Sequence, residues 1–184
     1  SDRGVTREIV AAAVEHGYEA LVLTVDMPVL GNRERDLRTG FVVGHATAIP
    51  MVNAAGGEGV LSLGEVVDLI DPSLTWSDVE AFAAQSGLPV IVKGVLRPED
   101  ARRAAEHGAA GVVVSNHGGR QLDTVLSGAD ALPPVVDEVG DEIDVLVDGG
   151  VRRGTDVLKA LALGARAVLV GRPVLWGLAV GGEA

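Results

Sequence analysis

The stretch Ala101-Arg-Arg-Ala-Ala-Glu-His-Gly108-Ala-Ala-Gly-Val-Val-Val-Ser-Asn116 decides the fold class of this chain. Its first half is an Ala-rich helical segment that ends at Gly108, and glycine accepts the positive φ that closes a helix. The short β-branched run at 112–114 follows almost at once and is typical of a buried parallel strand. The stretch therefore predicts a helix that leads directly into a strand.

The same pattern recurs along the chain. Ala-rich helical segments end at Gly17 and Gly164, and each leads into an apolar run. Two more apolar runs fit the series: Pro89-Val-Ile-Val-Lys-Gly94 and Ile143-Asp-Val-Leu-Val-Asp-Gly149. We therefore predict five strands, at 21–26, 90–94, 111–116, 144–148 and 167–171. Strands that alternate with helices form parallel sheets with right-handed crossovers.

The residues that could catalyse a reaction or bind a ligand lie at or just beyond the C-terminal ends of the predicted strands. They are Thr24, Asp26, Lys93, residues 115–120, Asp148, residues 149–152, Gly171 and Arg172. The active sites of (β/α)8 barrels lie at this end of the strands. We therefore predict an α/β fold in which residues 1–184 form part of a (β/α)8 TIM barrel, as about its last five βα units. An open doubly wound sheet is the structural alternative.

One connection is much longer than the others, from about residue 31 to 74. It is rich in glycine, and we expect a short helix near 63–70 within it. Long connections in compact domains are often lids, so we interpret it as a lid-like loop, with a surface insertion as the alternative. The next helix is expected to begin at Thr75, with Asp78 completing the cap, and Pro98 suits the first turn of the helix after that.

Composition excludes several classes of function. The 184 residues carry a net charge of −11, which disfavours nucleic acid because phosphate backbones need clustered Lys and Arg. There is no cysteine, so disulfides and Cys-ligated metals are impossible, and we assign no metal ligand. The absence of cysteine is compatible with a cytoplasmic protein, which we expect.

No apolar run is long enough to span a bilayer. The chain opens on Ser1 without an initiator methionine, so we expect it to start inside a longer protein.

A phosphate site is predicted at the ends of the last two strands. Asp148-Gly149-Gly150-Val151-Arg152 follows one strand and precedes a helix expected at 155–163, whose N-terminus offers free N–H groups to an anion. Gly171-Arg172 ends the next strand, and loops at these positions form the common phosphate cradle of such barrels. Arg152 and Arg172 can add charge-assisted hydrogen bonds, whereas Arg153 is assigned to solvent.

His117 is the candidate general base. The histidines in the two Glu-His-Gly sequences, His16 and His107, sit at predicted helix ends and suit the helix dipole. His117 instead follows a strand and precedes two glycines, which favours a base held toward a ligand, with a structural histidine as the alternative. Asp26 ends an apolar strand and would be costly to bury unpaired, so His117 is a suitable partner for it.

Three cations complete the candidate site. Arg120 lies in the loop that holds the predicted base, and its planar fork suits a carboxylate. Arg33 is a second candidate for that role, although its charged surroundings are also typical of a solvated surface. Lys93 ends an apolar strand, from which its ammonium can point at an electron-rich ring.

Taken together, these motifs resemble the FMN-dependent 2-hydroxy-acid dehydrogenase/oxidase family, which includes glycolate oxidase, L-lactate dehydrogenase and mandelate dehydrogenase. The signature Ser-Asn-His-Gly-Gly-Arg-Gln stands complete at 115–121. The shorter matches occur in the same order: Leu23-Thr-Val-Asp26, Arg33-Glu34, Val92-Lys-Gly94, Asp148-Gly-Gly-Val-Arg-Arg-Gly-Thr-Asp156 and Gly171-Arg-Pro173. The resemblance covers nearly the whole chain and is weakest at about 42–72.

The resemblance implies a role for each site residue. His117 takes a proton as a small L-2-hydroxy acid is oxidised to the 2-oxo acid, and Asp26 supports it. Arg120 and Arg33 hold the substrate carboxylate. Lys93 lies near the N1/O2 edge of the flavin and stabilises its reduced, anionic form.

The resemblance also implies FMN as the cofactor. The residues that it assigns to FMN are Thr24, Lys93, Ser115, Asp148, Gly149, Gly150, Arg152, Gly171 and Arg172. Thr24 and Ser115 contact the isoalloxazine, and Asp148 binds the ribityl chain. The residues that hold the phosphate are Gly150, Arg152, Gly171 and Arg172. The resemblance also implies a homo-oligomer, a tetramer, for the full-length protein. Some relatives attach to membranes through the loop at 31–74, but here that loop has no strongly basic amphipathic stretch.

Two alternatives remain at this point. Another phosphate-binding barrel, such as an FMN-dependent isomerase, would keep both glycine motifs but has no need for His117 and Arg120 in one loop. A catalytically incomplete fragment or binding module, which keeps the scaffold without turnover, is the second alternative. The family also binds substrate through tyrosines on its first three βα units, whereas the single tyrosine here, Tyr18, lies at a predicted helix-to-strand turn.

Overall fold

The computed structural model describes residues 3–29, 31–40 and 70–183. Its strands are β1 (Leu21–Thr24), β2 (Val90–Val95), β3 (Gly111–Val114), β4 (Asp144–Asp148) and β5 (Ala167–Leu169). Its helices are α1 (Arg3–Glu15), α2 (Glu34–Thr39), α5 (Trp76–Ser86), α6 (Pro98–Glu106), α7 (Gly128–Val139), α8 (Gly154–Ala162) and α9 (Arg172–Gly181). Within these ranges no helix is both long and apolar enough to cross a membrane.

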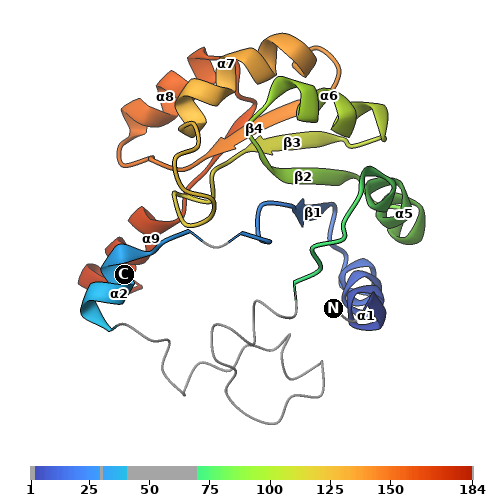
Figure 1. The fold of residues 1–184 in the computed structure, drawn as a ribbon, viewed down its shortest axis with the longest axis horizontal. Coiled ribbons are helices and arrows are strands. Elements are labelled where there is room, and N and C mark those ends of the chain that lie inside the picture. The colour runs from blue at the N-terminus through green and yellow to red at the C-terminus, as the bar shows by residue number, and fades with distance from the viewer. Residues whose placement is uncertain (1–2, 30, 41–69, 184) are drawn as a thin grey trace.

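The five strands form one parallel sheet in chain order, β1-β2-β3-β4-β5. Val92 of β2, for example, pairs with Leu23 of β1 on one side and with Val112 of β3 on the other. A doubly wound sheet reverses its strand order at a switch point, and this sheet has no such reversal among its described strands. The prediction of consecutive βα units of a (β/α)8 barrel is therefore confirmed. Helices α5 to α8 lie along one side of the sheet (Figure 1).

Several strands end earlier than the sequence predicts. The strands β1, β3 and β5 were expected to reach residues 26, 116 and 171 but end at 24, 114 and 169. The backbone ladder continues for one bond beyond two of them, because Val25 N donates to Lys93 O at 2.9 Å and Ser115 N donates to Val95 O at 3.2 Å. The chain then turns away, so the polar residues beyond each strand belong to loops at its C-terminal end.

The helix ends follow the expected capping chemistry. Asp78 accepts a hydrogen bond from the backbone N–H of Thr75 at 2.7 Å, which confirms the predicted start of α5. That bond is the main reason why the pKa of Asp78 lies below its usual value. Pro98 occupies the first turn of α6, as predicted. The helix α8 begins at Gly154, one residue before the predicted start.

The long connection contains a helix that the sequence reasoning missed. The six-residue helix α2 begins directly after Arg33 and ends at Thr39, and Gly40, with a φ of 63°, caps it. The helix expected near 63–70 lies almost wholly outside the described residues. The interpretation of residues 31–74 as a lid stays a prediction.

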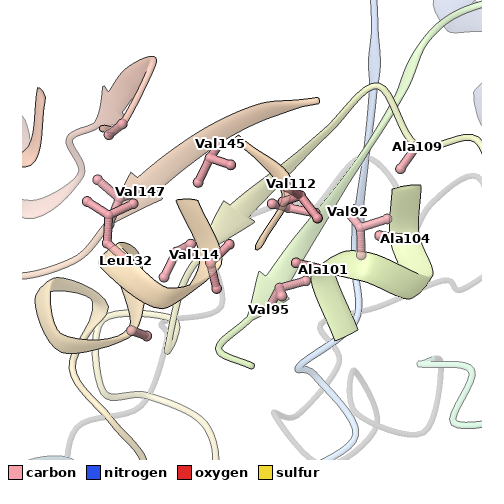
Figure 2. Packing of buried hydrophobic residues seen from close by; sticks show 14 of the residues in the cluster. Val92, Val95, Ala101, Ala104, Ala109, Val112, Val114, Leu132, Val145 and Val147 are labelled. Atoms are coloured by element: carbon pink, nitrogen blue, oxygen red, sulfur yellow. The ribbon is translucent and has the colours of Figure 1, made fainter. Parts of the chain in front are cut away.

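The hydrophobic core lies between the sheet and the helices α6 and α7. Its members include Val92, Val95, Ala101, Ala104, Val112, Val114, Leu132, Val145 and Val147 (Figure 2). Valine suits the strands because its branched Cβ fits a pleated surface, and alanine lets a helix approach the sheet closely. This packing holds the central strands, and therefore the loops at their C-terminal ends, in fixed positions.

We expect Val112→Ala to lower the free energy of unfolding by about 2 kcal/mol, because it removes buried methyl groups and leaves a cavity. Val112 is fully buried, at 0% exposure. The matched control is Val180→Ala on α9, where the side chain is 92% exposed. It should change the stability by less than about 0.5 kcal/mol. Urea unfolding followed by circular dichroism measures both, and equal losses would contradict the placement of Val112 in the core.

Candidate active site

An imidazole–carboxylate pair joins the loops that follow β1 and β3. The Nδ1 atom of His117 lies 3.0 Å from Oδ1 of Asp26, and the two side chains are 24% and 14% exposed. With Nδ1 engaged, Nε2 is the ring nitrogen that can serve a ligand. The second oxygen of Asp26, Oδ2, is buried and has no hydrogen-bond partner among the described residues. The pair can therefore accept a proton at Nε2 and stabilise the resulting charge through Asp26.

Gly94 makes room for this pair. It lies in β2, between the two joined strands, where the register shifts between Lys93 and Val95. Its φ is 108°, and a Cβ atom here would lie 2.8 Å from both Cβ and Cγ of Asp26. Any larger residue would displace the carboxylate. From the sequence, Gly94 could be recognised only as part of the motif Val92-Lys-Gly94, without a role of its own.

A tight turn presents His117. Residues 117, 118 and 119 all have positive φ values, of 56°, 66° and 72°. A non-glycine residue rarely adopts this conformation, so His117 is held in it by its surroundings. Its backbone N–H donates to Ser115 Oγ at 3.0 Å, and the N–H of Gly119 donates to Asn116 Oδ1 at 3.1 Å. The turn and the bond to Asp26 together fix the imidazole.

Lys93 connects three neighbouring strands. Its ammonium donates to Ser115 Oγ, just beyond β3, at 2.8 Å and forms an ion pair with Asp148 Oδ2, at the end of β4, at 3.0 Å. The Lys93 and Asp148 side chains are only 15% and 16% exposed. Asp148 Oδ1 is buried and accepts no hydrogen bond in the described part of the chain. Thr24, at the end of β1, pairs in register with Lys93 of β2. The predicted cofactor-binding residues Thr24, Lys93, Ser115 and Asp148 therefore lie at the C-terminal edge of four neighbouring strands.

The glycines after β4 form an open backbone turn. Gly149 and Gly150 have φ values of 85° and 74°, and within the described structure no atom lies within 4 Å of a Cβ placed on Gly150. The carboxylate of Asp156 accepts hydrogen bonds from the backbone N–H groups of Arg152 and Arg153 at 2.9 and 3.0 Å. These bonds, the first above all, lower the pKa of Asp156. These two amides precede α8, so the expected binding of an anion by the first N–H groups of the helix itself stays a prediction.

Of the two predicted phosphate-binding arginines, Arg152 contacts α9 and Arg172 is the first residue of α9. The guanidinium of Arg152 lies over the ring of Trp176, 4.9 Å from its centroid. Arg172 begins α9 one turn before Trp176, so Arg172 and Trp176 lie on the same face of that helix. Arg172 Nη2 donates to the carbonyl oxygen of Gly118 at 2.8 Å, which ties the end of the sheet to the loop that carries His117. Arg153 is exposed, as expected.

The two predicted carboxylate-binding arginines are also neighbours. Arg33 Nε donates to the carbonyl oxygen of Arg120 at 3.4 Å. Arg33 is half-buried and Arg120 is exposed. Their roles toward a substrate stay predictions, but the structure brings both next to the loop that carries His117.

Comparison with known proteins identifies relatives of this chain. The model of the FMN-dependent dehydrogenase family matches residues 1–184. An L-lactate oxidase from Nostoc sp. is 53% identical over 100% of the chain and 52% of its own length. An L-lactate dehydrogenase from Caulobacter vibrioides is 47% identical over 100% of the chain and 55% of its own length.

A solved structure is similar as well. The crystal structure of a mandelate oxidase with 3,3-difluoro-2-hydroxy-3-phenylpropionic acid superposes with a TM-score of 0.81 at 48% identity. The match covers 98% of this chain and 49% of that protein. The chain thus spans about half the length of the relatives that it matches. Because the family model matches from the first residue to the last, the chain belongs to the FMN-dependent dehydrogenase family.

Proposed function

We propose that this protein uses FMN to oxidise a small L-2-hydroxy acid to the corresponding 2-oxo acid. The observation that carries the proposal is the His117–Asp26 pair, which lies on the same sheet edge as the Lys93–Asp148 ion pair. The named relatives act on lactate and mandelate, which are both small 2-hydroxy acids.

The residues at the C-terminal edge of the sheet are suited to bind a flavin mononucleotide. Asp148 Oδ1 is a buried acceptor left without a donor among the described residues, and it would take the ribityl chain. The open turn at Gly150 and the guanidinium groups of Arg152 and Arg172 would hold the phosphate. Lys93 would supply positive charge near the ring. When bound, FMN supplies the two-electron acceptor that the oxidation requires.

The reaction needs a group that removes a proton from the substrate. His117 has its Nδ1 held by Asp26, so its Nε2 is the atom that accepts the proton. Asp26 stabilises the imidazolium that forms, as the carboxylate of a catalytic triad does. The bond also sets the orientation of the ring before the substrate arrives, which lowers the entropic cost of the step.

The substrate carboxylate needs a cationic partner beside this base. Arg120 lies three residues after His117, and Arg33 is linked to the Arg120 carbonyl. A guanidinium can bind a carboxylate through two parallel hydrogen bonds, which orient as well as attract it. An FMN-dependent isomerase has no need for His117 and Arg120 in one loop, and the site therefore favours the oxidation.

The proposed reaction is tested by anaerobic mixing. The protein, produced from its complete gene and loaded with FMN, should lose its oxidised-flavin absorbance when L-lactate, glycolate or mandelate is added. At least one of the three should reduce the flavin, because each presents a hydroxyl beside a carboxylate. A protein that takes up no FMN, or whose bound FMN stays oxidised with all three, would contradict the proposal.

A second test replaces the base. His117→Ala should bind FMN as the wild type does but reduce it at least about 10²-fold more slowly, because general-base catalysis contributes about 10²–10⁴-fold. Stopped-flow absorbance gives the rate, and an FMN titration gives the affinity. The matched control is His16→Ala, since His16 is exposed at the end of α1 and bonds to the Ala12 carbonyl. Wild-type reduction in His117→Ala would remove the general-base assignment.

A further inference from the structure

Two loops meet along a seam beside the candidate base. We define the β1 loop as residues 27–29 and 31–33, and the β3 loop as residues 115–124. The backbone N–H of Gly31 donates to the carbonyl oxygen of Arg120 at 3.2 Å. The same oxygen accepts from Arg33 Nε at 3.4 Å. One carbonyl thus holds both the backbone and the arginine side chain of the β1 loop.

The seam is closely packed at Gly31. A Cβ atom on this residue would collide with the carbonyl oxygen of Gln121 and would lie 3.0 Å from the carbonyl carbon of Arg120. Gln121 is only 2% exposed, and its side-chain amide donates to the sulfur of Met27. The two loops therefore contact each other as directly as two backbones can, and a shift of one displaces the other.

Asp123 supplies the charged bond across this seam. Its Oδ2 accepts a hydrogen bond from the backbone N–H of Asn32 at 2.8 Å, across 91 residues of sequence. This bond is shorter than the two at the Arg120 carbonyl, and its acceptor carries a charge. Asn32 stands between Gly31 and Arg33, so the bond holds the backbone that carries Arg33.

Asp123 does not belong to the reacting groups. It is exposed, and its carboxylate accepts a hydrogen bond from a backbone amide, that of Asn32. Its influence on a substrate passes through Asn32 to Arg33. An arginine can bind a carboxylate in two-point fashion only if its fork keeps its place relative to the rest of the site.

We propose that Asp123 is a positioning residue: by holding the Asn32 amide, it keeps Arg33 in place against the Arg120 carbonyl and so keeps the two arginines in register with His117. This inference rests on the proposed function, because that function assigns the substrate carboxylate to Arg33 and Arg120. The specific consequence is that loss of Asp123 weakens the binding of the carboxylate and leaves the proton transfer at His117 intact.

The first experiment compares Asp123→Ala, Asp123→Asn and the wild type in FMN-loaded protein produced from its complete gene. With the best of the three 2-hydroxy acids, Asp123→Ala should raise KM about tenfold and change kcat less than about twofold, because ground-state binding is lost rather than chemistry. Asp123→Asn should recover most of the affinity, since its amide oxygen can accept the same bond. Asp137→Ala, which removes an exposed carboxylate on α7, is the matched control and should behave as the wild type.

The second experiment follows amide hydrogen exchange and needs no turnover. Exchange of the Asn32 amide should become about tenfold faster in Asp123→Ala than in the wild type, because its acceptor is lost. It should stay near the wild-type rate in Asp123→Asn and Asp137→Ala. The amide of Val112, in the central strand, reports global stability and should be unchanged in all variants.

The two experiments distinguish a failure of the role proposed for Asp123 from a failure of the proposed function. Unchanged Asn32 exchange in Asp123→Ala overturns the inference, and so does faster exchange with an unchanged KM. A fall in kcat as large as the rise in KM also overturns it, because the base would then be disturbed. If the wild type binds FMN but oxidises no 2-hydroxy acid, the proposed function fails, and the exchange rates still decide whether Asp123 holds the Asn32 amide.

Discussion

The bond between His117 Nδ1 and Asp26 Oδ1 is the contact on which the rest of the site depends. It joins the ends of β1 and β3, although β2 lies between these strands in the sheet. The bond can form because β2 shifts its register at Gly94, which leaves space for the carboxylate. His117 accepts a left-handed backbone conformation to reach it, and the bond to Ser115 supports that conformation.

The same edge shows how the fold keeps charges at low exposure. Asp26 is paired with an imidazole, and Asp148 is paired with Lys93, so neither carboxylate is left alone in a poorly hydrated place. Each carboxylate still keeps one buried oxygen without a partner among the described residues. If these residues served only to stabilise the fold, both oxygens would be expected to accept hydrogen bonds, because buried acceptors without a donor are costly. Their presence, together with membership of the family, favours a site built for ligands.

The order of the strands could be predicted from the sequence because it depends on local patterns. Each strand is a short β-branched run after a glycine-terminated helix, and parallel βα units place all the strand ends at one edge. The predicted ends of the strands were less accurate, because the backbone hydrogen bonds between strands stop where the chain turns toward the site. The short helix α2 was missed because its charged sequence, Glu34–Thr39, has no apolar periodicity. Gly94 and Asp123 were missed for another reason. Their roles depend on Asp26 and Asn32, which are distant in the sequence and meet them only in the folded chain.

The claim that His117 and Asp26 act as one catalytic unit has a direct test. The rate of FMN reduction by a saturating 2-hydroxy acid would be measured for the wild type, Asp26→Asn, His117→Gln and the double variant. Residues that act as a unit give strongly non-additive effects. We expect the double variant to react within about threefold of His117→Gln alone, because the carboxylate has no further function once the imidazole is gone. If the two losses multiply in the double variant, the residues act independently and the account of this pair is wrong.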